Sequence, residues 1–339
     1  MKILISGYYG FGNCGDEAVL RAIRRGFKDH ELTVIEKKIR YSFFKIVREI
    51  LRSDLFLSGG GTLFQNKTSN RSFYYYLGLI LLAKLLRRRV MIIAQGFGPL
   101  KGRINRLLAK LILDRVNIIT LRDNDSFREI QKLGVKRPDI EVTADPTFIL
   151  NLPDPEIGKT ILTLEGVKLG EKPLLGIAVR TLPKEFSVRF VEIIDYLSEK
   201  YNYTPVLVPF QAPEDMGQSN RIISNLREGS HIIFRNCMPS EMLSIFSQFD
   251  LVIGMRLHSL IFAALNITPM LGISYDPKVE AFMKEIEQPY VDINHPAGMK
   301  AALEAIIKNR ESIKQKLAVK KKELQEKAQK NFSVVEGIE

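Results

Sequence analysis

The sequence predicts an α/β protein made of two Rossmann-like domains that face each other across a cleft. Three observations predict this fold class. The chain has 339 residues, more than a single domain usually holds. Short apolar runs alternate with amphipathic stretches in both halves, which is typical of parallel sheets covered by helices. Between the halves, residues 151–155 carry two prolines and cannot continue a helix or a central strand.

In the first half, apolar runs predict strands and the amphipathic stretches between them predict helices. The strands are expected at residues 3–6, 32–35, 55–58, 90–94 and 118–121. The helices are expected at residues 17–27, 73–86, 103–113 and 126–133. Gly134 stands where a glycine commonly ends a helix, and Asp123 or Asn124 can cap the helix that begins at Ser126.

The same rhythm resumes in the second half. Strands are expected at residues 174–179, 206–208, 231–234, 251–253 and 270–273, with helices at 189–199, 221–227, 240–249 and 259–266. Residues 308–332 are helix-forming and rich in lysine, which predicts a solvated helix packed across a domain, with binding to anionic lipid or polymer as the alternative. We therefore expect domains at 1–152 and 153–310, followed by a basic C-terminal helix at 311–339.

Composition limits the function classes. A net charge of +12 favours anionic partners without choosing between nucleic acid, membrane surfaces and acidic substrates. Two cysteines far apart argue against a disulfide scaffold or a zinc site and fit a reducing compartment. The first six residues read as a strand instead of a signal segment, and no apolar run reaches the length of a spanning helix. We expect a cytoplasmic protein, with peripheral contact at the inner face of the cell membrane left open.

A glycine-rich loop follows the first expected strand. It holds four glycines in the nine residues from Gly7 to Gly15, and Asp16 and Glu17 then open a helix. These carboxylates suit the positive end of the helix and disfavour a phosphate there, and neither GxGxxG spacing nor a Walker lysine is present. The loop is a tight turn closed by a capping carboxylate, or it is an acceptor-hydroxyl site with Asp16 or Glu17 as general base.

Two more glycine-rich loops follow strands of the same half. One contains Gly59, Gly60 and Gly61, and the other runs from Gln95 to Pro99. Because the carboxyl ends of parallel strands share one edge, the three loops are expected to line one rim. Asp145, which precedes Pro146, is a turn former or a residue of the cleft.

In the second half, a strand end offers positive charge and a titratable group. Arg256 and His258 lie between the apolar run 251–253 and a helix pattern, where backbone N–H groups favour an anion. Arg180 ends another strand. Lys278 is a further cation near a strand end, and it is a weaker candidate for binding the anion. The other histidines, His30, His231 and His295, have no metal-like spacing.

Together these motifs resemble the polysaccharide pyruvyl transferase family, most closely its CsaB-type members of bacterial cell-wall synthesis. The resemblance covers nearly the whole chain. It is carried, in order, by the loop from Gly7 to Glu17, the glycines 59–61, Gln95 to Pro99, Arg122-Asp123 with Ser126, Asp145-Pro146 with Phe148, Arg256-Leu257-His258, and Tyr275-Asp276-Pro277-Lys278.

The resemblance implies a GT-B-like fold and an enzyme that transfers an enolpyruvyl-derived group from phosphoenolpyruvate, a substrate, without a cofactor or a metal. The product would be a cyclic pyruvate ketal on a sugar. In the CsaB type the sugar is an N-acetylmannosamine on a lipid-linked wall-polymer precursor, and the ketal later anchors surface-layer proteins. The donor-binding residues would be Arg180, Arg256, Leu257, His258 and Lys278.

The chemistry of phosphoenolpyruvate suits these side chains. Arginines neutralise its carboxylate and phosphate, and ketal formation needs a proton on the methylene carbon. Protonated His258 is the candidate acid, with the anionic donor raising its pKa and Arg256 opposing that rise. Catalytic roles thus fall to His258, Arg256 and, as base, Asp16. The acceptor-binding residues are expected to be Asn13, Asp16, Glu17, Gly59, Gly60, Gly61 and Gln95.

A basic and aromatic stretch at residues 37–48 suits a helix at an anionic membrane surface, or equally one whose aromatics enter the core. The rival enzyme class is a sugar-nucleotide glycosyltransferase of the same fold. Such enzymes commonly carry a ribose-binding glutamate seven residues before a Gly-x-Pro-type turn. Here that position, counted back from Pro269, is Phe262, which cannot accept ribose hydroxyls. No nucleic-acid motif is present, so nucleic acid is not an expected partner.

Overall fold

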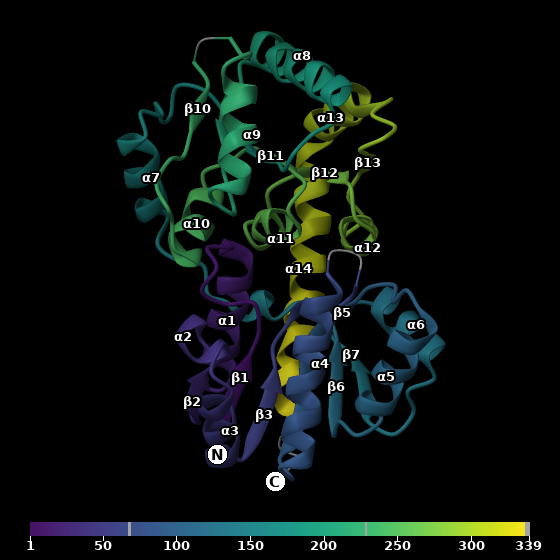
Figure 1. Cartoon of the computed structure of the whole chain (residues 1–339). Helices are drawn as coiled ribbons and strands as arrows, with labels where there is room; N and C mark the ends of the chain where they lie inside the picture. The colour runs from purple at the N-terminus through teal and green to yellow at the C-terminus, as the bar shows by residue number, and fades with distance from the viewer. Residues whose placement is uncertain (67–68, 228, 336–339) are drawn as a thin grey trace. The chain divides into compact units, whose positions relative to one another are not determined.

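The computed structural model describes residues 1–66, 69–227 and 229–335, and the chain divides into two compact units (Figure 1). Unit 1 comprises Met1–Phe11, Asp16–Leu150 and the chain from Glu323 onward. Unit 2 comprises Gly12–Gly15 and Asn151–Lys322. The division after Leu150 lies two residues before the expected boundary. The C-terminal helix, however, is divided between the units instead of standing apart, and four residues of the first glycine loop belong to unit 2.

Unit 1 is built on a parallel sheet in the order β2-β1-β3-β5-β6-β7, with β4 paired to β5. Its strands are β1 (Lys2–Ser6), β2 (Glu31–Val34), β3 (Leu55–Ser58), β4 (Gly61–Phe64), β5 (Arg89–Phe97), β6 (Ile118–Leu121) and β7 (Asp139–Val142). Its helices are α1 (Cys14–Gly26, which begins in unit 2), α2 (Lys37–Arg40), α3 (Phe43–Arg52), α4 (Asn70–Leu85), α5 (Arg103–Leu113), α6 (Asn124–Leu133) and the 3₁₀ helix η1 (Pro146–Ile149).

A hydrophobic core covers each face of this sheet. Successive side chains of β5 alternate between the two cores, with Val90 and Ile92 in one and Met91 and Ile93 in the other. Because both faces are covered, these four residues have no solvent exposure, which explains why β5 reads as a continuous apolar run.

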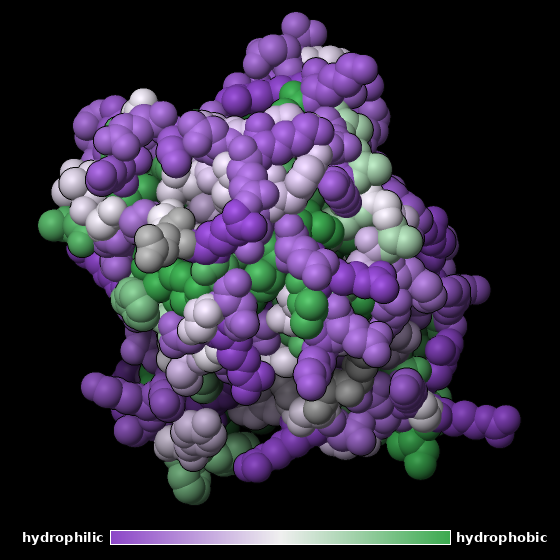
Figure 2. Space-filling view, turned by 90° about the horizontal axis from the view of Figure 1, so that it is seen from above, coloured by the Kyte–Doolittle hydropathy of each residue, from purple (hydrophilic) through white to green (hydrophobic). Residues whose placement is uncertain are grey.

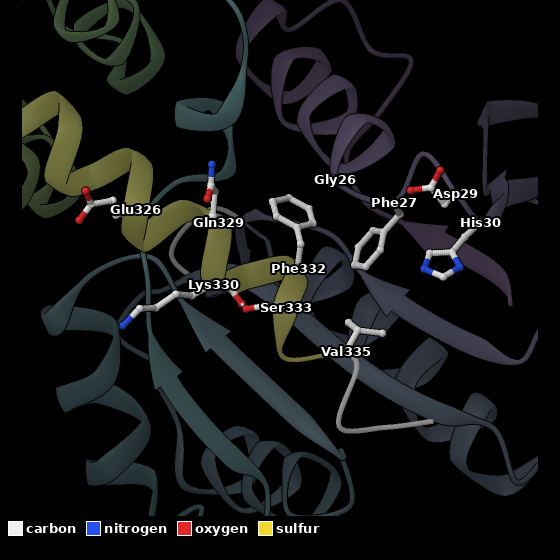
Figure 3. A pocket seen from close by; sticks show the side chains of 10 residues that line it. All are labelled: Gly26, Phe27, Asp29, His30, Glu326, Gln329, Lys330, Phe332, Ser333 and Val335. Carbon is white, nitrogen blue, oxygen red and sulfur yellow. The ribbon is translucent and has the colours of Figure 1, made fainter.

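The end of α14 (Arg310–Ser333) completes unit 1. Phe332 packs edge-on against Phe27 with ring centroids 5.2 Å apart, beside a cavity of about 780 Å³ (Figure 3). The neighbouring Asn331 is fully buried: its amide donates to the Ala144 carbonyl at 2.9 Å, and its oxygen accepts from the hydroxyls of Thr120 and Thr143 at 2.6 and 2.7 Å. This lysine-rich helix is therefore anchored by apolar and amide side chains at its end.

Unit 2 is a second parallel sheet, in the order β10-β9-β8-β11-β12-β13. This is the strand order 3-2-1-4-5-6 of a doubly wound fold. Its strands are β8 (Leu174–Ala178), β9 (Thr204–Leu207), β10 (His231–Ile232), β11 (Leu251–Gly254), β12 (Met270–Ser274) and β13 (Tyr290–Asp292). Its helices are α7 (Pro155–Leu164), α8 (Lys184–Tyr201), α9 (Glu214–Ile223), α10 (Pro239–Phe246), α11 (Leu257–Leu265), α12 (Pro277–Glu285), α13 (Met299–Lys308) and the first part of α14.

The predicted fold class is confirmed, since two parallel α/β sheets are present. The predicted helix start at residue 221 was wrong: α9 begins at Glu214 and ends at Ile223. No described helix is both long and apolar enough to cross a bilayer. On the face seen in Figure 2, hydrophilic side chains predominate and hydrophobic ones form smaller groups between them.

Candidate functional site

Two arginines lie at the point in unit 2 where the strand order reverses. β8 and β11 are neighbours, and Ala178 is paired with Gly254 at their carboxyl ends. Arg180 follows β8 by two residues, and Arg256 follows β11 by two residues. In open α/β sheets, ligands bind at this position because the loops leave in opposite directions and open a crevice. The two arginines predicted from strand ends are therefore brought to one place.

The segment after Arg256 is fixed by the core. Arg256 is the N-cap of α11, and eight of the nine residues of that helix are buried. His258 is the second residue of the helix, so it lies in the first turn, where N–H groups lack helical acceptors. Leu257, the first residue of α11, is buried.

Asp215 holds the Arg256 guanidinium. Nε of Arg256 donates to Oδ2 of Asp215 at 3.0 Å, and a second nitrogen contacts Oδ1. Asp215 is only 1% exposed and also accepts from the backbone N–H groups of Phe210 and Gln211 at 3.1 and 3.0 Å. The remaining Arg256 nitrogen donates to the Gln211 side chain at 3.1 Å. A bidentate pair of this kind fixes the plane of the arginine.

Glu214 lies between the two arginines. Its carboxylate is 3.9 Å from Arg180 and 3.8 Å from Arg256, and its side chain is 57% exposed. Arg180 also donates to the Tyr275 hydroxyl at 3.3 Å and lies over that ring. Burial lowers the pKa of Arg180, but the Tyr275 hydroxyl and the nearby carboxylates outweigh this and hold the pKa above its usual value. A partly exposed carboxylate therefore lies within ion-pair distance of both arginines.

The end of the first glycine loop packs against these residues within unit 2. The backbone N–H of Cys14 donates to the Phe210 carbonyl at 2.9 Å, and the Asn13 amide donates to Gln211 at 3.3 Å. A Cβ atom at Gly15 would lie 2.2 Å from Nδ1 of His258, so the imidazole occupies the space that a side chain would need. The sequence places Asn13 with the acceptor set. In the structure it lies with the donor set, because the loop pairs with Gln211.

Lys278 follows the next strand of the same sheet. β12 pairs with β11, and Lys278 is the second residue of α12, whose N-cap Asp276 accepts from the Lys278 backbone at 3.1 Å. The first turn of α12 therefore begins at the same edge as that of α11.

Unit 1 presents the start of the first glycine loop and the loop at Gly59 at its own switch point, whereas residues 95–97 of the third predicted loop form the end of β5. β1 and β3 are paired through Ser6 and Ser58, and Gly59 N–H donates to the Ser6 carbonyl at 2.6 Å. The Tyr9 ring covers both loops: a Cβ atom would lie 2.3 Å from it at Gly7 and 2.0 Å from its hydroxyl at Gly59. These glycines are needed because an aromatic ring lies directly on them.

The Tyr9 hydroxyl is a polar group that was not among the site residues predicted from the sequence. Tyr9 is buried, and its hydroxyl has no hydrogen-bond partner among the described residues. Burial raises its pKa well above the usual value, and the charges of Asp16 and Glu17 add to this rise. The group is therefore a neutral phenol at physiological pH and can donate a hydrogen bond.

The predicted acceptor residues divide into those that hold the loops and those near the rim. Glu17 accepts from Gly10 N–H at 2.6 Å and closes the turn. Gln95 is fully buried, and its amide nitrogen donates to the carbonyls of Gly61 and Gly96 at 2.8 and 3.0 Å, so this nitrogen joins β4 to β5. Asp16 lies next to Gly61, where an added Cβ would be 3.6 Å from its carboxylate.

Asp145 and Asp123 both cap helical turns. Asp145 accepts from the backbone and hydroxyl of Thr147 at 3.1 and 2.7 Å, which supports the turn-former reading. Asp123 accepts from Ser126 N–H at 2.7 Å, as predicted. Arg122 lies buried between these two carboxylates, at 3.3 Å from Asp123 and 3.8 Å from Asp145. Within the described ranges, no group of three or more His, Cys, Asp or Glu side chains is placed to hold a metal.

Residues 13–277 match the family described as polysaccharide pyruvyl transferase. The chain belongs to this family. The match spans most of the sequence and includes the loop residue Asn13, the residues Arg180, Arg256 and His258, and the turn ending at Pro277. The resemblance at family level is confirmed, and the protein is an enzyme of polysaccharide pyruvyl transfer.

A curated relative is named as a biosynthesis protein. The amylovoran biosynthesis protein AmsJ of Erwinia amylovora is 21% identical over an alignment that covers 94% of this chain and 95% of that protein. Such coverage shows that this polysaccharide pyruvyl transferase and AmsJ correspond along nearly their full lengths.

Solved structures of low identity share the fold of this transferase. HepE of Anabaena, determined with UDP and glucose, is 14% identical with a TM-score of 0.63, covering 99% of this chain and 96% of that one. A UDP-GlcNAc 2-epimerase from Neisseria meningitidis, bound to UDP-GlcNAc, is 13% identical with a TM-score of 0.66, covering 100% and 99%. These similarities support a GT-B-like fold with two Rossmann-like domains. They do not indicate the substrate of this protein.

Proposed function

We propose that this transferase takes its pyruvyl group from phosphoenolpyruvate and forms a cyclic pyruvate ketal on a sugar, with release of phosphate. The observation that carries the proposal is the pair of arginines at the switch point of unit 2, which already share the carboxylate of Glu214. Phosphoenolpyruvate has a carboxylate and a phosphate, and each suits a guanidinium fork.

The donor would displace Glu214 and bind Arg180 and Arg256. Arg256 is held in place by Asp215, so its charge is oriented before the substrate arrives. The first turns of α11 and α12 add backbone N–H groups and, at α12, the ammonium of Lys278. His258 lies in the first turn of α11 and would protonate the methylene carbon.

The reaction balances without a further reagent. A proton added to the methylene carbon leaves an oxocarbenium-like centre on the adjacent carbon, and a sugar hydroxyl attacks it. A second hydroxyl then replaces the phosphate as the bond between that carbon and the phosphate oxygen breaks. Of the two hydroxyl protons, one replaces the proton given by the acid and the other leaves with phosphate. In unit 1, Asp16 is the candidate base and Tyr9 a candidate donor to the acceptor sugar.

The acceptor in this proposal is a lipid-linked amino-sugar saccharide. The resemblance to the CsaB type favours an N-acetylmannosamine of a secondary cell-wall polymer precursor, whose ketal would later anchor surface-layer proteins. The reaction would then take place in the cytoplasm, at the inner face of the membrane. The net charge of +12 supports an acidic donor and an anionic surface as partners.

Phe262 argues against sugar-nucleotide glycosyl transfer. It stands where such glycosyltransferases commonly place a ribose-binding glutamate. It is fully buried and packs against Phe210 and Phe246, with ring centroids 5.6 and 5.9 Å away. A side chain in that position serves the core and cannot reach a nucleotide.

The test is turnover with defined substrates. The protein is incubated with phosphoenolpyruvate and a synthetic lipid-linked N-acetylmannosaminyl acceptor, and phosphate release and a pyruvate-sized mass gain are followed. His258→Ala is expected to abolish turnover with little change in melting temperature. His295→Ala, on a side chain that is 85% exposed, is the matched control. Consumption of a UDP-sugar with no use of phosphoenolpyruvate would overturn the proposal.

A further inference from the structure

A groove of about 520 Å³ runs over the surface of unit 1 between α2, α3 and α4. Its lining is mostly apolar and aromatic and includes Tyr41, Phe43, Tyr75, Leu82 and Leu85. Arg40 is the one charged residue among the described residues of the lining. Nothing in the predicted donor or acceptor sets uses this groove.

Large apolar side chains project beside the groove. Tyr41, Phe43, Phe44 and Leu85 are 75%, 63%, 84% and 70% exposed. The core-facing side chains of α3 are Ile46 and Ile50, so the two phenylalanines are not needed by the core. Exposed apolar groups gathered in one patch mark an interaction surface, because each costs solvation free energy in the isolated protein.

The charge around the patch is strongly positive. Residues 37–52 contain six basic side chains and one acidic side chain, Glu49, which pairs with Arg48 at 3.0 Å. α4 contains no acidic residue and is followed by the run Arg87-Arg88-Arg89. An apolar patch with a basic rim is complementary to a bilayer that carries anionic headgroups.

The same charge disfavours a second copy of the chain as the occupant. A two-fold contact brings one patch against the identical patch of the other copy. Here that contact would place two basic rims together, and like charges across an interface are repulsive.

Arg40 connects the groove to the first glycine loop. It donates to the Gly7 carbonyl at 3.3 Å and to the Tyr76 hydroxyl at 3.0 Å, and it lies over the rings of Phe11 and Tyr75 at 5.1 and 4.5 Å. The patch is therefore continuous, within unit 1, with the loop that carries Tyr9.

We propose that the face formed by α2, α3 and the groove side of α4 docks on an anionic bilayer. Phe43, Phe44 and Tyr41 enter the boundary between headgroups and acyl chains, and the basic side chains around them contact the headgroups. This docking brings the loop from Gly7 to Phe11 next to the bilayer, where a lipid-linked sugar is presented. Only that last consequence rests on the proposed function.

The test is sedimentation of the full chain with vesicles of phosphatidylcholine alone and with vesicles of equal parts phosphatidylcholine and phosphatidylglycerol. The protein is expected to bind the mixed vesicles, to bind the neutral ones much less, and to be released by salt. Phe43→Ser combined with Phe44→Ser is expected to weaken binding about tenfold or more. The matched control combines Phe234→Ser with Val188→Ser, on two exposed apolar positions of unit 2, and should bind as the parent does. Unchanged melting temperatures show that the variants fold.

Three results would overturn the proposal: no vesicle binding, equal binding to both vesicle types, or equal loss in both double variants. Self-association that vanishes in the Phe43, Phe44 variant, without vesicle binding, would assign the face to a second copy instead. Binding is measured without turnover, so its outcome is independent of the pyruvyl-transfer assay. With a soluble acceptor, the Phe43, Phe44 variant should retain the parent turnover.

Discussion

Asp215→Asn tests whether a buried carboxylate prepares Arg256 for the donor. In the folded protein, Asp215 accepts from two backbone N–H groups and from two nitrogens of Arg256. Asparagine has the same shape but only one acceptor oxygen. Its amide nitrogen must therefore face a donor, either from the backbone or from Arg256, and the arginine is left without its full counter-charge.

The expected cost follows from burial. Asp215 is 1% exposed and the Arg256 side chain is 11% exposed, so water cannot replace the lost partner. Removing one partner of a buried pair costs about 3–5 kcal/mol. We expect about 3 kcal/mol here, because Glu214 remains near Arg256 and is partly exposed. For a domain of this size, that lowers the melting temperature by roughly 6–12 °C.

The assay separates stability from positioning. Thermal unfolding gives the stability change, and initial rates below the new melting temperature give KM for phosphoenolpyruvate and kcat. We expect KM to rise about tenfold or more, since the guanidinium is no longer held in one plane. Asp195→Asn, which removes a carboxylate on α8 that accepts from Arg227 N–H, is the control and should leave KM unchanged. An Asp215→Asn enzyme with parental stability and KM would refute the reasoning.

Three further predictions concern single contacts. Gly15→Ala places a Cβ where the His258 imidazole lies. We therefore expect kcat to fall about a hundredfold while the melting temperature changes little. A kcat equal to that of the parent would show that the position of the imidazole does not matter. Glu214→Gln removes the carboxylate that phosphoenolpyruvate would displace in the proposed reaction, so KM for phosphoenolpyruvate should fall about 1.5–5-fold. A raised KM would show that Glu214 helps binding. Burial, with the charge of Glu241 adding, raises the pKa of Cys237 to about 11, so the neutral thiol dominates below that pH. Alkylation of Cys237 is followed by peptide mass spectrometry. At pH 8 it should be roughly a hundredfold slower in the folded protein than after denaturation, and it should accelerate with rising pH. Equal alkylation rates in the folded and denatured protein would contradict this.

The sequence was most informative where strands are buried on both faces. The predicted strands at residues 55–58 and 118–121 coincide with β3 and β6, because every residue in them is buried and apolar or small. β7 and β13 were not predicted. They are short outer strands in which Asp139, Glu141 and Asp292 interrupt the apolar pattern. β4 was hidden because it begins at Gly61, inside a glycine run.

The sequence allowed the site residues to be found from their positions at the ends of strands. It did not reveal which side chains they contact. Arg180, Arg256 and His258 were found because they follow apolar runs. Asp215 was missed because the helix was placed at residue 221. The signal was present, since Pro213 followed by two acidic residues is a typical helix start. The packing of Gly15 on His258 joins residues distant in sequence, and no local pattern encodes it.

The anchoring of α14 sets the order in which the protein can mature during synthesis. Unit 1 begins at Met1, yet Asn331 and Phe332 belong to its core. Until those residues emerge from the ribosome, the hydroxyls of Thr120 and Thr143 lack their shared acceptor, and Phe27 lacks its contact with the Phe332 ring. Unit 2 needs only the four residues Gly12–Gly15 from the first half, and these are made early. The unit that is translated first is therefore the unit that is finished last, and a chain cut short before residue 331 leaves that unit open to the cell's quality-control proteases.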